Sequence, residues 1–125
     1  MASSKLALIV EDTPQIADAF SFVLQAAGFE TEVLTDGVMA LARLQDSSRD
    51  LPLIVVLDMN LPRMDGAEVL RRIRADERLA HLQVIVATAN SHMAEAVEDQ
   101  ADIVLLKPVS FEQLRALSTR LARPM

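Results

Sequence analysis

Three carboxylates, one hydroxyl group and one ammonium group stand directly after short apolar runs of this chain: Glu11 and Asp12, Asp58, Thr88, and Lys107. If these runs are neighbouring strands of one sheet, the carboxylates converge, and they cannot all stay ionised without a proton or a cation close by. Carboxylate oxygens suit a hard cation, and Mg²⁺, which retains several waters, fits so few protein ligands better than Ca²⁺. Zinc is not expected, because the chain has no cysteine and its histidines, His81 and His92, lie elsewhere.

Lys107 is distinctive because the chain carries ten arginines but only two lysines, Lys5 and Lys107. An ammonium group contacts a single oxyanion from any direction, whereas a guanidinium group prefers a flat partner with two acceptors. Lys107 ends an apolar run and precedes Pro108, so it would deliver a compact charge where a buried strand surfaces. For this residue alone, a solvated strand end is the simpler alternative.

Each of the other groups also has an ordinary structural use. Asp12 and Thr13 before Pro14 could cap a helix, and Thr88 could simply end a strand. Asp58 is harder to explain in this way, because a charge at the mouth of a buried run needs a partner. The occurrence of all these groups after four different runs favours a site more than any single residue does.

Five apolar runs alternate with segments of helical periodicity. The predicted strands are Leu6 to Val10, Glu30 to Leu34, Leu53 to Leu57, Leu82 to Ala87 and Ile103 to Leu106. All except the second are almost continuously apolar, which is typical of strands covered by helices on both faces. The second alternates, as an edge strand does.

Helices are predicted in the intervals between these strands and after the last one. They are a helix from Pro14 to a stop at Gly28, one around Val38 to Leu44, one over Ser91 to Asp99, and two opened by the capping boxes Asp65–Glu68 and Ser110–Gln113. Five strands alternating with five helices predict an α/β fold with a doubly wound parallel sheet. In the flavodoxin-like order 2-1-3-4-5, ligands bind beyond the carboxyl ends of the first and third strands.

Length and composition limit the possible functions. A chain of 125 residues is expected to form one domain, residues 1–125, large enough to fold without a disulfide or a structural metal. A net charge of −6 argues against direct binding of nucleic acid, and the one dense basic patch, Arg71, Arg72 and Arg74, is expected to be a solvated helix face. The absence of cysteine agrees with a reducing cytoplasm, and the first apolar run is too short for an export signal or a membrane span.

Over essentially its whole length the chain resembles the receiver domain of bacterial two-component response regulators. The motifs that carry the resemblance are the acid pair Glu11–Asp12, the segment from Asp58 to Gly66, Thr88 with Ala89, and Lys107 with Pro108. The resemblance implies that Asp58 is the phospho-acceptor and that Thr88 and Lys107 contact the phosphoryl oxygens. It also implies that Mg²⁺ is held by Glu11, Asp12, Asp58 and the backbone carbonyl of Asn60.

The resemblance implies a cytoplasmic signalling switch rather than an enzyme with an external substrate. A sensor histidine kinase or a histidine phosphotransfer protein would supply the phosphoryl group. An effector would bind the face built by the stretch from Ser91 to Asp99, the fifth strand and the helix after Ser110. No residues after Met125 could form an effector domain, so a stand-alone or an excised receiver is expected.

Two alternatives remain open at this point. One is a receiver-like scaffold that acts without phosphorylation. The other is a phosphatase with an aspartyl nucleophile, a class that needs a second acid two residues after the nucleophile, where this chain has Asn60.

Four features depart from the receiver pattern. Glu11 stands where a second aspartate is commonest, Val104 where an aromatic residue usually rotates inward on phosphorylation, and Gln100 where a glycine is usual. The stretch from Thr88 to Lys107 is also slightly short. These departures concern the fourth helix and the output route more than the phosphorylation site.

Overall fold

The computed structural model describes residues 5–121, in which five parallel strands lie in the order β2-β1-β3-β4-β5. The strands are β1 (Leu6–Val10), β2 (Glu30–Leu34), β3 (Ile54–Asp58), β4 (Gln83–Thr88) and β5 (Ile103–Leu106). The helices are α1 (Pro14–Ala26), α2 (Gly37–Gln45), α3 (Gly66–Ala75), α4 (Ser91–Val97) and α5 (Phe111–Leu121). The predicted fold class and strand order are therefore confirmed. The predicted domain of residues 1–125 includes the segments 1–4 and 122–125, which lie outside the described residues.

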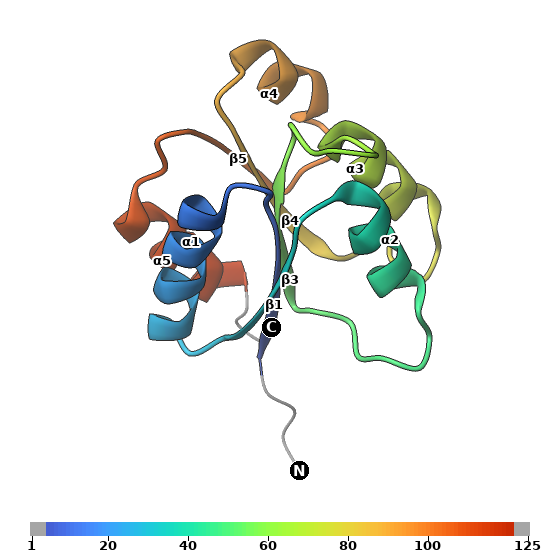
Figure 1. Ribbon diagram of the computed structural model, residues 1–125, viewed down its shortest axis with the longest axis horizontal. Helices are drawn as coiled ribbons and strands as arrows, with labels where there is room; N and C mark the ends of the chain where they lie inside the picture. Colours follow the sequence, from blue (N-terminus) through green and yellow to red (C-terminus); the bar gives the residue numbers. More distant parts are fainter. Residues whose placement is uncertain (1–4, 122–125) are drawn as a thin grey trace.

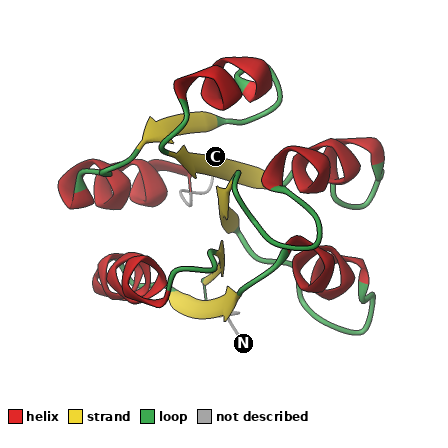
Figure 2. Cartoon of the chain, turned by 45° about the horizontal axis from the view of Figure 1, so that its top comes forward, coloured by secondary structure: helices red, strands yellow, loops and turns green. Residues whose placement is uncertain are grey.

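Helices cover both faces of the sheet (Figures 1 and 2). Alternate residues of a strand point to opposite faces, so Ala7 and Ile9 pack beneath α1 and α5, whereas Leu8 and Val10 pack beneath α2, α3 and α4. Two apolar cores result, one on each side of the sheet. Together they hold the carboxyl ends of β1, β3 and β4 in a fixed arrangement at one edge of the fold.

The strand boundaries differ from the predicted ones at two places. β3 and β4 each begin one residue later than predicted and extend to Asp58 and Thr88, so these two residues belong to the strands. Leu53 was predicted to open a buried run, but it is 43% exposed. A strand boundary is set by backbone pairing rather than by hydrophobicity. The Leu53 N–H donates to the Leu6 carbonyl, but the pairing of β3 with β1 begins one residue later, at Ile54 and Ala7.

β5 is an edge strand, as the predicted order 2-1-3-4-5 places it, and its residues pack against both cores, Val104 on one side and Leu105 on the other. It pairs only with β4 among the described residues, and its last residue, Leu106, is 53% exposed. Apolar composition alone cannot distinguish an edge strand of this kind from a central one. β2 is the other edge strand, as its alternation predicts.

The helix starts follow the predicted caps in part. The Asp65 carboxylate accepts a hydrogen bond from the Glu68 N–H at 2.9 Å, and the Ser110 hydroxyl accepts one from the Gln113 N–H at 3.2 Å. The Glu68 side chain does not complete a box with Asp65, because it pairs with the exposed Arg71 and with Arg72.

The remaining arginine of the basic patch has a structural use, which corrects its prediction as part of a solvated face. The Arg74 guanidinium donates hydrogen bonds to the carbonyls of Ala80, Leu82 and Gln100 and to the Asp102 carboxylate. These bonds satisfy backbone carbonyls in the loops around β4 and before β5. Arg74 therefore fixes the segment that leads into β5.

Candidate functional site

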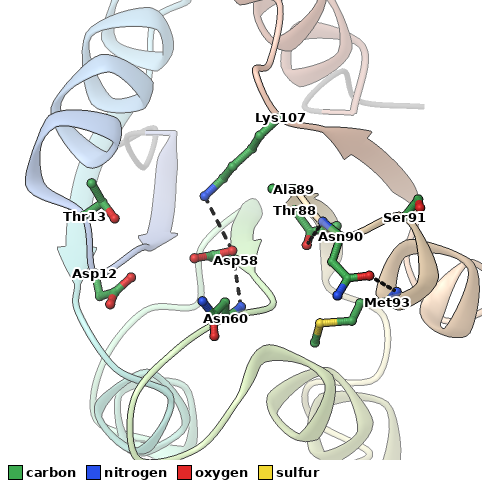
Figure 3. A pocket seen from close by; sticks show the side chains of 10 residues that line it. All are labelled: Asp12, Thr13, Asp58, Asn60, Thr88, Ala89, Asn90, Ser91, Met93 and Lys107. Atoms are coloured by element: carbon green, nitrogen blue, oxygen red, sulfur yellow. Dashed lines mark hydrogen bonds and ion pairs between the residues drawn. The ribbon is translucent and has the colours of Figure 1, made fainter.

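The predicted site residues meet at the carboxyl edge of the sheet, where the resemblance and the strand order place them. Asp58 is the last residue of β3, and Thr88 is the last residue of β4. Lys107 directly follows β5, and Asp12 lies two residues after the end of β1. A pocket of about 690 Å³ opens between them (Figure 3). Its lining residues are Asp12, Thr13, Asp58, Asn60, Thr88, Ala89, Asn90, Ser91, Met93 and Lys107.

The three acids form a compact cluster. One carboxylate oxygen from each of Glu11, Asp12 and Asp58 lies within 4.8 Å of the other two. Asp12 is exposed at the pocket, whereas Glu11 is 1% and Asp58 6% exposed. A set of hard oxygen donors with one open, solvated side fits Mg²⁺, which keeps part of its water shell. Asp12 is the acid that faces solvent, so it fits direct coordination better than Glu11, which lies behind the pocket wall.

Lys107 is the counter-charge of this cluster. Its Nζ lies 2.8 Å from Glu11 Oε1 and 3.5 Å from Asp58 Oδ1, and its side chain is only 16% exposed. The alternative of a solvated strand end is therefore wrong. One cation for three acids leaves the cluster with excess negative charge, which a bound divalent cation would offset.

The pKa of Glu11 reflects the same imbalance. Burial raises its pKa above the ordinary value of 4.5, the hydrogen bond from Lys107 opposes that rise, and the neighbouring charge of Asp58 adds to it. Burial thus disfavours the charged form of Glu11, and the hydrogen bond from Lys107 is the main influence that opposes this cost.

The loop after β3 keeps Asp58 in place. The Asn60 N–H donates to Asp58 Oδ1 at 3.3 Å, and the Gly66 N–H donates to the Met59 carbonyl at 2.9 Å. A Cβ at position 66 would overlap the Asp58 carbonyl oxygen, so only glycine permits this close approach of α3 to the end of β3. Both Lys107 and Asn60 contact Oδ1 of the Asp58 carboxylate.

Asp12 does not serve as the helix cap that was considered for it. Thr13 is the N-cap residue of α1, and its side chain makes no capping hydrogen bond. Instead, the Thr13 N–H donates to Glu11 Oε2 at 3.3 Å, and Pro14 opens the helix without needing a partner for its nitrogen.

Thr88 connects the pocket to α4. Its hydroxyl oxygen accepts a hydrogen bond from the Asn90 N–H at 3.1 Å, and the side-chain oxygen of Asn90 accepts from the N–H groups of His92 and Met93, which caps α4. Figure 3 shows Asn90 between Thr88 and Met93 at the side of the pocket. Sequence reasoning missed Asn90 as a pocket residue, although an asparagine before a short amphipathic stretch is a recognisable N-cap signal.

Comparison with known proteins agrees with this arrangement. A family model described as the response regulator receiver domain matches residues 7–119. The chain is 34% identical over 119 residues to the DNA-binding dual master transcriptional regulator RpaA of Synechocystis, covering 93% of the chain and 48% of RpaA. It is 37% identical over 109 residues to the sensory transduction protein RegX3 of Mycobacterium tuberculosis, covering 87% of the chain and 47% of RegX3. The chain thus spans about half the length of these relatives.

Solved structures show the same fold. The phosphorylated cyanobacterial phytochrome response regulator RcpA superposes with a TM-score of 0.80 at 25% identity, covering 95% of this chain and 91% of RcpA. The Mn²⁺-bound form of the response regulator Rcp1 superposes with a TM-score of 0.79 at 28% identity, covering 94% of this chain and 91% of Rcp1. Within residues 5–121, none of the helices has the length and apolar character needed to cross a bilayer.

Proposed function

The chain belongs to the response regulator receiver family, and from this we propose that it accepts a phosphoryl group on Asp58 from a histidine of a partner protein. The observation that carries the proposal is the meeting of Asp58 with Asp12, Thr88 and Lys107 around one solvent-open pocket. The donor would be a sensor histidine kinase or a histidine phosphotransfer protein. The phosphorylated structure of RcpA and the Mn²⁺-bound structure of Rcp1 support this chemistry in related proteins.

The proposed transfer forms one bond and breaks one. A carboxylate oxygen of Asp58 attacks phosphorus and forms an acyl phosphate, while the P–N bond to the donor imidazole breaks and its electron pair stays on the nitrogen. Lys107, already 3.5 Å from Asp58, offsets the charge of the incoming phosphoryl group. The Thr88 hydroxyl donates to a phosphoryl oxygen, a bond that exists only in the phosphorylated state.

Mg²⁺ would be held by Asp12, Asp58 and the backbone carbonyl of Asn60, with Glu11 behind them. When bound, Mg²⁺ would supply positive charge that offsets the charge of the phosphoryl oxygens. The chain's own residues align the nucleophile: the Asn60 N–H and Lys107 orient the Asp58 carboxylate. Because Glu11 is buried and already paired with Lys107, its contribution is the placement of Lys107 as well as negative charge.

The signal is proposed to leave through the face formed by α4, β5 and α5. Thr88 is linked through Asn90 to the start of α4, so a move of Thr88 toward the phosphoryl group changes the cap of that helix. An effector domain or protein would bind this face. We also propose that the chain acts in the cytoplasm, catalyses only its own phosphorylation and dephosphorylation, and makes no direct nucleic-acid contact. The DNA-binding description belongs to RpaA, of which this chain matches about half.

The test is incubation with acetyl phosphate and Mg²⁺, followed by intact mass, on wild type and on Asp58→Asn. Wild type should gain one phosphoryl group that mild alkali removes, because an acyl phosphate is labile, and Asp58→Asn should gain none. Asp65→Asn, which changes an exposed acid outside the pocket, is the matched control and should label like wild type. Equal labelling of Asp58→Asn and wild type would refute the assignment, and an alkali-stable label would indicate serine or threonine.

A further inference from the structure

A second hollow of about 460 Å³ lies between α4 and the outer edge of β5, next to the phosphorylation pocket. Its lining residues are Ser91, Ala94, Glu95, Glu98, Ala101, Asp102, Ile103, Val104 and Leu106. We call it the α4–β5 groove. Its floor is apolar, and Leu106 in it is 53% exposed although leucine at a strand position is usually covered.

The groove is open for two structural reasons. α4 has only seven residues, and β5 is the edge strand of the sheet, so no further element covers that side within residues 5–121. Val104 also contributes a small side chain at the position where the receiver resemblance places an aromatic residue. The surface left exposed is aliphatic and able to accept apolar side chains of another protein.

The rim of the groove is acidic. Among the lining residues there is no lysine, arginine or histidine. Asp102 is already engaged, because its Oδ2 accepts hydrogen bonds from Arg74 and from the Val84 N–H. Glu95 and Glu98 are exposed and make no ion pair with any described residue. Glu95 lies in α4, and Glu98 is its C-cap residue with helical backbone angles, so these two acids, three positions apart, lie about one turn from each other on the same side.

We propose that the α4–β5 groove binds a cationic amphipathic helix of a partner protein. The apolar face of that helix rests on Val104 and Leu106, and lysine or arginine side chains one turn apart meet Glu95 and Glu98. Charge complementarity favours a cationic partner, because an acidic one would face two unpaired carboxylates at the rim. A helix also matches the spacing of the two acids.

The groove adjoins the phosphorylation pocket through Ser91, which lines both hollows. The cationic helix would be the output partner of the proposed function. The inference rests on that function only in that phosphorylation of Asp58 would control binding of the helix. The complementarity of groove and helix does not itself require a phosphoryl group.

The probe is a synthetic amphipathic helix of about four turns with leucines and one tryptophan on one face and lysines beside them. The chain contains no tryptophan or tyrosine, so the fluorescence of the peptide alone reports binding. The variant Glu95→Gln/Glu98→Gln should weaken binding about three- to tenfold at low salt, as expected for two exposed ion pairs. Leu106→Ser should weaken it about tenfold at any salt concentration.

The matched control is Glu30→Gln/Glu77→Gln, which removes the same net charge from exposed positions away from α4, β5 and α5 and should leave affinity unchanged. Three outcomes would overturn the proposal: equal binding to wild type and Glu95→Gln/Glu98→Gln, an equal loss in the control, or equal binding of a peptide with glutamates in place of the lysines. Acetyl phosphate labelling of the same preparations separates the two proposals. Normal labelling without peptide binding rejects the groove alone, and peptide binding without labelling rejects the phosphorylation site alone.

Discussion

Replacement of Lys107 by methionine tests the electrostatic account of the site most directly. In the folded protein Lys107 is the only cation within 4 Å of the buried carboxylates of Glu11 and Asp58 among residues 5–121. Methionine keeps most of the side-chain volume but leaves both acids without a counter-charge. Removing one partner of a buried ion pair costs about 3–5 kcal/mol, and because the Lys107 side chain is 16% exposed at an open pocket we expect a smaller loss of about 2 kcal/mol.

The distances from Lys107 Nζ to Glu11 and to Asp58 indicate how this loss of stability divides between the two acids. The bond to Glu11 is 2.8 Å long and the contact with Asp58 is 3.5 Å, so most of the penalty belongs to Glu11. In a Glu11→Gln background, Lys107→Met should therefore cost only about 1 kcal/mol, and the difference between the backgrounds measures the coupling of the pair. Arg115→Met, an exposed change on α5, should cost less than about 0.5 kcal/mol.

The pH dependence has a definite sign. The pKa of Glu11 is raised in the folded state, so the protonated form stabilises the fold below the ordinary value of 4.5, and this contribution disappears as pH rises through the folded pKa. Lys107 is the main influence that lowers this pKa. Without Lys107 the folded pKa rises further, so the penalty of Lys107→Met should grow with pH above 4.5 and be small below it.

The assay is urea unfolding followed by circular dichroism, since the chain lacks tryptophan and tyrosine, with a chelator present to exclude divalent cations. Glu11→Gln and wild-type backgrounds should be compared at several pH values. An equal loss in both backgrounds, or a loss that grows as pH falls, would refute the role of Lys107 as the partner of Glu11.

Two further predictions concern the cation and the core. Without Mg²⁺, Asp12→Asn should raise the melting temperature measured by calorimetry, because it reduces repulsion in the acid cluster. The same variant should lose most of the stabilisation that Mg²⁺ gives wild type. A wild-type melting temperature that does not change with Mg²⁺ would contradict the metal site. Ser118→Ala should raise the free energy of unfolding in urea by about 1 kcal/mol. The Ser118 hydroxyl is buried in α5 without a hydrogen-bond partner, and alanine is the better helix former. A loss of stability would contradict the absence of a partner for this hydroxyl.

Much of the site was predictable because of how parallel sheets are built. Continuous apolar runs between helical segments predict strands covered on both faces, and the carboxyl ends of such strands meet at one edge. For this reason Asp58, Thr88 and Lys107 could be grouped from sequence although they lie far apart in the chain. The helix caps Asp65 and Ser110 were also predictable, because a cap bonds the backbone N–H only three residues further along the chain.

The pairing of specific charges was decided only by the tertiary structure. The sequence pattern does not show that Lys107 bonds Glu11, 96 positions away, more closely than Asp58. It also does not distinguish Arg74, which binds backbone carbonyls, from the exposed Arg71, because both occupy similar positions on one helix. The exposure of Leu106 was likewise decided by packing, because the short helix α4 leaves the last residue of β5 uncovered. Sequence periodicity determined which residues share a face or an end of the sheet, whereas strand register and side-chain packing determined which of them touch.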